Sequence, residues 1–114
     1  MDGAELILLY DYYGDLLTDR QKECFELRYN QDLSLGEIGL ELGISRQAAF
    51  DNLSRTEALL KNMEMKTGCV RRDMQCRKAI HDVVNAAKRL ALHDDQQVTD
   101  LANGILRAVA GLEE

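Results

Sequence analysis

The sequence predicts an all-α protein, and three observations support this prediction. The 114-residue chain has no proline, and it lacks runs of β-branched residues. Its apolar residues make up 46% of the chain and recur at three- and four-residue steps, which is the spacing of one helix face. Glycines and capping residues divide these runs into segments of helical length. This length suits one compact core, so we expect a single helical domain over residues 1–114.

The first two helices are predicted from an apolar face and a capping box. A helix over residues 4–13 carries leucines and tyrosines on one face, and Gly14 ends it. Thr18 is a good N-cap, and Gln21 is placed to complete a capping box with it. We therefore expect a second helix over residues 19–29.

A short helix and a long helix follow, separated by a tight turn. Ser34 and Glu37 form another capping box, and Gly43 suits the left-handed position that ends the short helix. Ser45 then caps a helix predicted over residues 46–66. Small or apolar residues occupy the matching core and turn positions, namely Ile38, Gly39, Leu42, Ile44 and Ala49. This combination predicts a helix-turn-helix core within residues 18–66.

A pair of helices is predicted in residues 69–114. The first should span residues 69–92, and Asp94 or Asp95 should cap the last helix after a short turn. One apolar side of the first helix carries Ala79, Ile80, Val83, Ala87 and Leu90. The last helix has its own apolar face, formed by Val98, Leu101, Ala102, Ile105, Val109 and Leu112. One chain of this length has difficulty covering several long apolar faces, so we expect a homodimer.

Charge and cysteine content limit the function classes. The net charge of −6 argues against a protein that binds any polyanion. Residues 1–44 carry −7, residues 45–68 carry +1, and residues 69–114 are balanced. Three cysteines without a CxxC pair suggest free, buried thiols in a reducing cytosol. Without a leader or an apolar run of membrane-spanning length, we expect a cytoplasmic protein that does not contact the membrane.

Catalysis has little support in this sequence. Neither a nucleophile–base arrangement nor a glycine-rich phosphate loop or metal-ligand cluster is visible. We therefore expect no enzyme activity, no catalytic residues, no metal site and no cofactor.

Several segments carry a family resemblance. The stretch "LLTDRQKECFELRYNQDLSLGEIGLELGIS" resembles the fourth region of bacterial sigma-70 factors, which binds the −35 promoter element. The front half is more closely similar to the YlxM family of small helical proteins, through "LYDYYGDLLTDRQ", "SLGEI", "SRQAAFDN" and "SRTEALL" in this order. The resemblance covers residues 6–66 and implies a sigma-70 region 4-like helix-turn-helix core with an N-terminal helix and a C-terminal helical extension.

The YlxM resemblance also implies a role in the signal recognition particle pathway. Members of that family are linked to regulation of the particle's GTPase, and their genes tend to lie beside the gene of that GTPase. They form α-helical homodimers. The partners that this resemblance implies are therefore the GTPase or the RNA of the particle.

The start of the long helix is the main candidate for contact with a partner or a nucleic acid. The candidate residues are Ser45, Arg46, Gln47, Phe50, Asp51 and Arg55. Arg46 and Gln47 could contact base edges in the major groove, whereas Asp51 would repel phosphates. An aromatic residue with a charged rim is instead typical of a protein interface. Alternatively, Phe50 packs inside the protein or across the dimer interface.

A basic stripe on the predicted helix over residues 69–92 is the second candidate. Its residues are Arg71, Arg77, Lys78, Lys88 and Arg89. It could bind RNA phosphates, dock on the acidic front of a second subunit, or form a solvated face. Three functions remain open at this point. They are an accessory protein of the particle, a transcriptional regulator that binds duplex DNA through Arg46, Gln47 and Arg55, and a structural dimerisation module.

Overall fold

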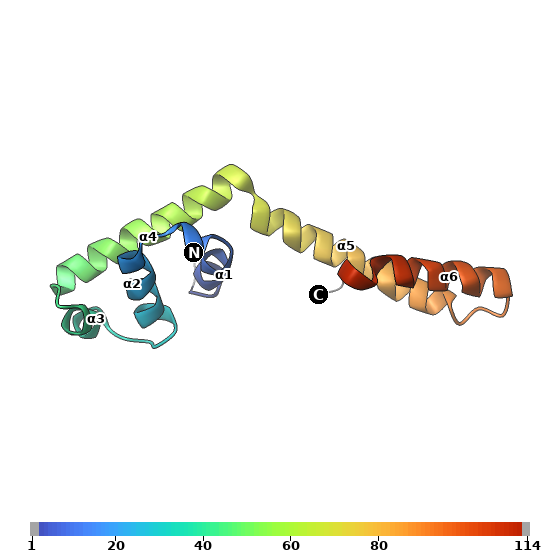
Figure 1. Ribbon diagram of the computed structural model, residues 1–114, viewed down its shortest axis with the longest axis horizontal. Helices are drawn as coiled ribbons and strands as arrows, with labels where there is room; N and C mark the ends of the chain where they lie inside the picture. The colour runs from blue at the N-terminus through green and yellow to red at the C-terminus, as the bar shows by residue number, and fades with distance from the viewer. Residues whose placement is uncertain (1–2, 113–114) are drawn as a thin grey trace. The chain divides into compact units, whose positions relative to one another are not determined.

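The computed structural model describes residues 3–112, and within that range it contains helices and no strands (Figure 1). The α-helices are α1 (Gly3–Tyr13), α2 (Asp19–Tyr29), α3 (Leu35–Leu42), α4 (Arg46–Thr67), α5 (Cys69–Leu90) and α6 (Gln96–Val109). Short 3-10 turns, Gly14–Leu16 and Ala110–Leu112, follow α1 and α6. The all-α prediction is confirmed. None of the helices in residues 3–112 combines the length and the apolarity needed to span a membrane.

The chain forms two compact units, residues 1–70 and residues 71–114. The first unit contains α1 to α4 and the beginning of α5. The second unit contains the remainder of α5 and α6. The expected arrangement of the whole chain as one domain stays a prediction.

Both predicted capping boxes are present. The Thr18 hydroxyl accepts a hydrogen bond from the Gln21 N–H at 3.2 Å, and the Thr18 N–H donates to the Gln21 side chain at 2.9 Å. Ser34 and Glu37 repeat this pattern at 3.1 and 3.0 Å. Two hydrogen bonds from Ser34 to the Glu37 carboxylate lower the pKa of Glu37. The larger effect comes from the Ser34 backbone N–H and the smaller one from its hydroxyl. These local contacts fix where α2 and α3 begin.

The turn between α3 and α4 depends on two glycines. Gly43 ends α3 with a φ of 69°, a left-handed conformation that side chains disfavour. At Gly39, an added Cβ would lie 2.7 Å from the carbonyl oxygen of Ile44, so only glycine allows α4 to start this close to α3. The Ser45 hydroxyl then accepts from the Ala48 N–H at 3.0 Å and caps α4. The structure therefore contains the predicted helix-turn-helix.

The first unit has a core made of two apolar clusters. The larger cluster contains Leu6, Leu9, Tyr13, Leu17, Phe25, Leu60 and Val70. The smaller cluster contains Cys24, Ile38, Ala49 and Leu53. Phe25 is 1% exposed, and its ring stacks on Tyr10 with centroids 4.3 Å apart and contacts Tyr29 at 4.5 Å. Phe25 was not predicted to be a core residue, although it is the largest fully buried side chain among residues 3–112.

Three tyrosine hydroxyls tie the helices of this unit together by donating to glutamates. The pairs are Tyr10–Glu26 at 2.9 Å, Tyr13–Glu64 at 2.6 Å, and Tyr29–Glu57. They join α1 to α2, α1 to α4, and α2 to α4. Burial, followed by the hydrogen bond to the glutamate, raises the pKa of Tyr10 and of Tyr29 from 10 to about 12.

Alkaline pH is expected to destabilise the first unit. Because the folded pKa of Tyr10 and Tyr29 lies above the ordinary value of 10, folding favours the neutral phenols. Their contribution is fully present below pH 10 and is lost as the pH rises towards about 12. Thermal unfolding followed by circular dichroism from pH 9 to pH 12 measures this loss. The double variant Tyr10→Phe/Tyr29→Phe should show a shallower decline than the unchanged protein. Equal slopes in the two would contradict the assignment.

The second unit is a pair of helices with little buried surface. After the turn, the Asp95 carboxylate accepts from the Gln97 N–H at 2.8 Å, so Asp95 is the cap of α6. The side chains buried in residues 71–112 are Val84, Ala87 and Ala102. The predicted apolar side of α5 therefore lies only partly against its neighbour. Ala87 is buried, whereas Val83 and Leu90 are 44% and 46% exposed.

The three cysteines are free and differ in exposure. Cys24 is buried, Cys69 is partly buried and Cys76 is exposed. Burial raises the pKa of the Cys24 thiol. The expectation of free thiols is confirmed, but the expectation that all three are buried is wrong, because Cys76 lies on an uncovered face of α5.

Candidate partner interface

The start of α4 presents the six candidate contact residues to solvent. One side of this helix is anchored in the core by Ala49, Leu53 and Thr56. Ser45, Arg46, Gln47, Phe50, Asp51 and Arg55 are all exposed on the remaining surface. The helix-turn-helix therefore places these side chains on a rigid helix, where they are available to a partner.

Phe50 and Asp51 give this surface its chemical character. Phe50 is 50% exposed and belongs to neither core cluster, so it does not pack inside the first unit. The carboxylate of Asp51 accepts a hydrogen bond from the Gln47 side chain at 3.0 Å. This bond engages the amide that could otherwise contact an adenine, and it holds a negative charge in the second turn of the helix.

The arginines of the first unit divide into two groups. Arg46 and Arg55 form no ion pair or hydrogen bond with any residue in the range 3–112. In contrast, Arg20 donates to the carbonyl of Leu42 at 3.3 Å, where α3 ends. Cations at a helix C-terminus satisfy its free carbonyls. Arg20 therefore supports the helix-turn-helix itself, a role that the sequence analysis missed.

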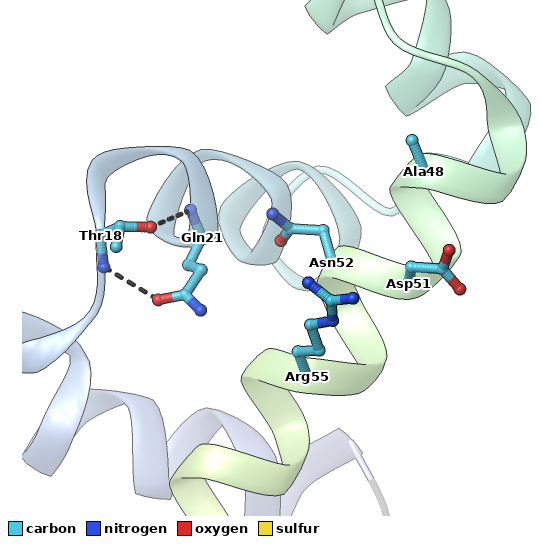
Figure 2. Close-up of a pocket in the computed structure, with 6 residues that line it drawn as sticks. All are labelled: Thr18, Gln21, Ala48, Asp51, Asn52 and Arg55. Atoms are coloured by element: carbon cyan, nitrogen blue, oxygen red, sulfur yellow. Dashed lines mark hydrogen bonds between the residues drawn. The ribbon is translucent and has the colours of Figure 1, made fainter.

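A pocket of about 370 Å³ lies beside this surface, between α4 and the start of α2 (Figure 2). Its lining residues are Thr18, Gln21, Ala48, Asp51, Asn52 and Arg55. Figure 2 shows Asn52 pointing from α4 towards the Thr18–Gln21 turn. The side-chain oxygen of Asn52 is buried and has no hydrogen-bond partner among residues 3–112. A buried acceptor without a donor costs about 1–3 kcal/mol.

A second hollow, of about 500 Å³, continues along α4. Its lining residues are Gln21, Arg55, Ala58, Leu59 and Asn62. Because Gln21 and Arg55 line both hollows, the two are adjacent, and together we call them the α4 groove. Arg55 and Asp51 were predicted as contact residues, whereas the amide side chains of the groove were not. Asn52 and Asn62 can be recognised as groove residues only from the folded chain, in which the start of α2 lies beside them.

The basic stripe lies in the second unit. Arg71, Arg77, Lys78, Lys88 and Arg89 are all exposed on α5. Arg77 forms an ion pair with Asp73 one turn earlier, at 3.1 Å. An exposed pair of this kind contributes little to stability. The stripe therefore remains accessible to an anionic partner.

The two histidines of the chain make local contacts. The ring of His93 accepts a hydrogen bond from the Asp95 N–H at 2.9 Å within the turn before α6. His81 lies 3.1 Å from the Asn85 side chain, one turn along α5. Within residues 3–112, no three His, Cys, Asp or Glu side chains gather as metal ligands would.

Comparison with known proteins gives a consistent result. Residues 2–101 match the model of the UPF0122 family, described as "Putative helix-turn-helix protein, YlxM / p13 like". A UPF0122 protein of Desulforamulus reducens is 40% identical over 102 residues, which cover 90% of this chain and 87% of that protein. A relative from Thermoanaerobacter sp. (strain X514) is 50% identical over 74 residues, which cover 65% of this chain and 63% of that protein. A relative from Listeria innocua is 42% identical over 93 residues, which cover 82% of this chain and 84% of that protein.

Proposed function

Because the chain belongs to the UPF0122 family of YlxM/p13-like helix-turn-helix proteins, we propose that it is a non-enzymatic accessory protein of the signal recognition particle pathway. It binds the GTPase of the particle, its RNA, or both. The pathway follows from the YlxM resemblance of residues 6–66. The contact surfaces follow from the geometry of α4 and α5.

The exposure of Phe50 is the observation that carries the protein-binding part of the proposal. A half-exposed aromatic side chain on a rigid helix costs solvation free energy until a partner covers it. Arg46, Gln47 and Asp51 surround it with both charges and an amide, which resembles the polar rim of a protein interface. We therefore assign the GTPase contact to the outer face of α4.

RNA is assigned to the basic stripe of α5. Five cationic side chains on one helix can neutralise several phosphates, and each contact releases counterions. The second unit has seven basic and seven acidic residues, whereas the first unit has seven basic and thirteen acidic residues. An RNA would therefore meet less repulsion at the second unit than at the first.

Binding of duplex DNA is the second candidate function. The helix-turn-helix geometry favours it, because Gly39 and Gly43 allow the close crossing of α3 and α4. Arg46 and Arg55 are unpaired among residues 3–112 and could contact bases or phosphates. The net charge of −6 on residues 1–70 and the Gln47–Asp51 hydrogen bond favour a protein target instead.

A homodimer formed by the second unit completes the proposal. On α5, the exposed residues Val83 and Leu90 lie around the helix to one side of the buried Val84 and Ala87. On α6, the exposed residues Leu101 and Ile105 lie around the helix to one side of the buried Ala102, in the same rotational sense. In an antiparallel pair these two strips lie on the same face, opposite the basic stripe. An uncovered apolar face on two helices needs a partner, and a second neutral unit meets no net repulsion.

The test is a titration of the purified full-length chain against three probes at several salt concentrations. The probes are the particle GTPase, the particle RNA and a duplex DNA. We expect Phe50→Ala to weaken GTPase binding at least about tenfold, as loss of an interface anchor does. Leu40→Ala is the matched control, because Leu40 is 87% exposed on α3. Lys78→Ala/Lys88→Ala should reduce RNA binding and its salt dependence.

Two results would overturn this assignment. Binding to duplex DNA but to neither particle component would establish the second candidate, particularly if Arg46→Ala abolished it. Binding to none of the three probes would leave dimerisation as the sole function of these surfaces and would reject the pathway role.

A further inference from the structure

We propose that the α4 groove binds an extended peptide segment of a partner protein, with an acidic residue and an apolar residue two positions apart. This inference concerns a surface beside the one around Phe50, and the two surfaces share Asp51 and Arg55. It holds whichever macromolecule the surface around Phe50 contacts.

The dimensions of the groove suit a short extended segment. Its lining residues on α4 run from Ala48 to Asn62, which corresponds to roughly 21 Å at the helical rise per residue. An extended peptide rises about 3.3 Å per residue, so about six residues span this length. The start of α2 forms the opposite wall through Thr18 and Gln21.

Amide side chains give the groove a means of holding a peptide backbone. Gln21, Asn52 and Asn62 line it, and each carboxamide offers both a donor and an acceptor. The oxygen of Asn52 is buried without a donor from residues 3–112. Because this oxygen is covered in the unbound chain, rotation of the Asn52 side chain into the groove would bring it to a peptide N–H and remove the cost of leaving it unpaired. Backbone recognition of this kind tolerates many sequences, so selectivity must come from other residues.

Arg55 and Leu59 provide that selectivity. Arg55 lines both parts of the groove and has no ionic partner among residues 3–112, so it favours an acidic side chain. Leu59 is 39% exposed beside Ala58 and offers an apolar contact. Four residues of helix separate Arg55 from Leu59 by about 6 Å. In an extended chain, residues two positions apart are separated by about the same distance, and their side chains point to the same side.

A nucleic acid fits this groove less well. Asp51 stands at one end and would repel a phosphate backbone, whereas the amide side chains match a neutral peptide chain. The apolar contact at Leu59 offers nothing to a phosphate. A peptide with one acidic residue satisfies Arg55 without placing a continuous row of charge beside Asp51.

Nuclear magnetic resonance of the isotope-labelled full-length chain tests the proposal. The probes are the blocked hexapeptides Gly-Gly-Glu-Gly-Leu-Gly and Gly-Leu-Gly-Glu-Gly-Gly, which cover both chain directions. We expect one of them to cause saturable shifts in the side-chain amide signals of Asn52 and Gln21. Replacing Glu by Lys in that peptide should weaken binding about tenfold, since attraction to Arg55 becomes repulsion.

Variants of the groove provide the control. Arg55→Glu should reverse the preference between the Glu and Lys peptides, whereas Arg46→Glu changes the same charge outside the groove and should preserve it. Leu59→Ser should weaken binding without altering the charge preference. The spectra of core residues report whether each variant is folded. The absence of saturable shifts with either peptide, or equal binding of the Glu and Lys peptides, would reject the proposal.

Discussion

Phe25→Ala is expected to unfold the first unit at or near room temperature. Phe25 is 1% exposed and contacts Tyr10 and Tyr29 through its ring, so truncation leaves a cavity at the junction of α1 and α2. Replacing a buried phenylalanine by alanine costs about 3–5 kcal/mol. Small domains are stable by only about 5–15 kcal/mol in total, and a unit of this size is expected near the lower limit.

The chain provides a matched control, because its other phenylalanine is exposed. Phe50→Ala makes the same chemical change at a side chain that is 50% exposed, and we expect it to change the melting temperature only slightly. Circular dichroism and chemical denaturation measure both variants. Equal destabilisation by the two substitutions would show that Phe50 is buried in solution, which would remove the anchor from the proposed interface.

Leu101→Glu/Ile105→Glu is expected to convert the proposed dimer into a monomer. These residues are 72% and 39% exposed in the single chain and lie on the uncovered apolar face. In a dimer, each new carboxylate would be buried without a partner, at a cost of several kcal/mol. Two such residues per chain, four per dimer, should shift the dissociation constant by more than about a hundredfold.

Analytical ultracentrifugation of the full-length chain measures this change. Leu40→Glu is the control, because Leu40 is 87% exposed in the first unit and its substitution should leave the dimer intact. A monomeric unchanged protein at micromolar concentration would reject the dimer directly. A double variant that dimerises as well as the unchanged protein would place the interface elsewhere.

The helix boundaries could be predicted from the sequence because local contacts determine them. Thr18 and Ser34 bond to residues three positions later, and Gly43 ends α3 through its own backbone conformation. Such signals lie within four residues of chain. The helix-turn-helix could therefore be recognised without knowledge of tertiary structure.

The core and the groove depend on contacts between distant segments, and they were predicted less well. Phe25 is buried because Tyr10 from α1 stacks on it, and no local pattern reports that stacking. On α5, periodicity identifies the apolar side of the helix but not the part of it that is buried. Val83 was therefore placed on the apolar side although it is 44% exposed, and the buried Val84 was not predicted. Asn52 is polar and unremarkable in sequence. Its oxygen is buried without a partner only in the folded chain.

The position of Arg55 has a further consequence for how this protein chooses among ligands. Arg55 belongs both to the outer face of α4 and to the groove, and one guanidinium cannot serve two anionic groups in different places at once. Occupants of the two surfaces would therefore compete directly, without any change in the shape of the helix. A single rigid α-helix could in this way act as an exclusive selector, in which the more abundant or tighter ligand displaces the other.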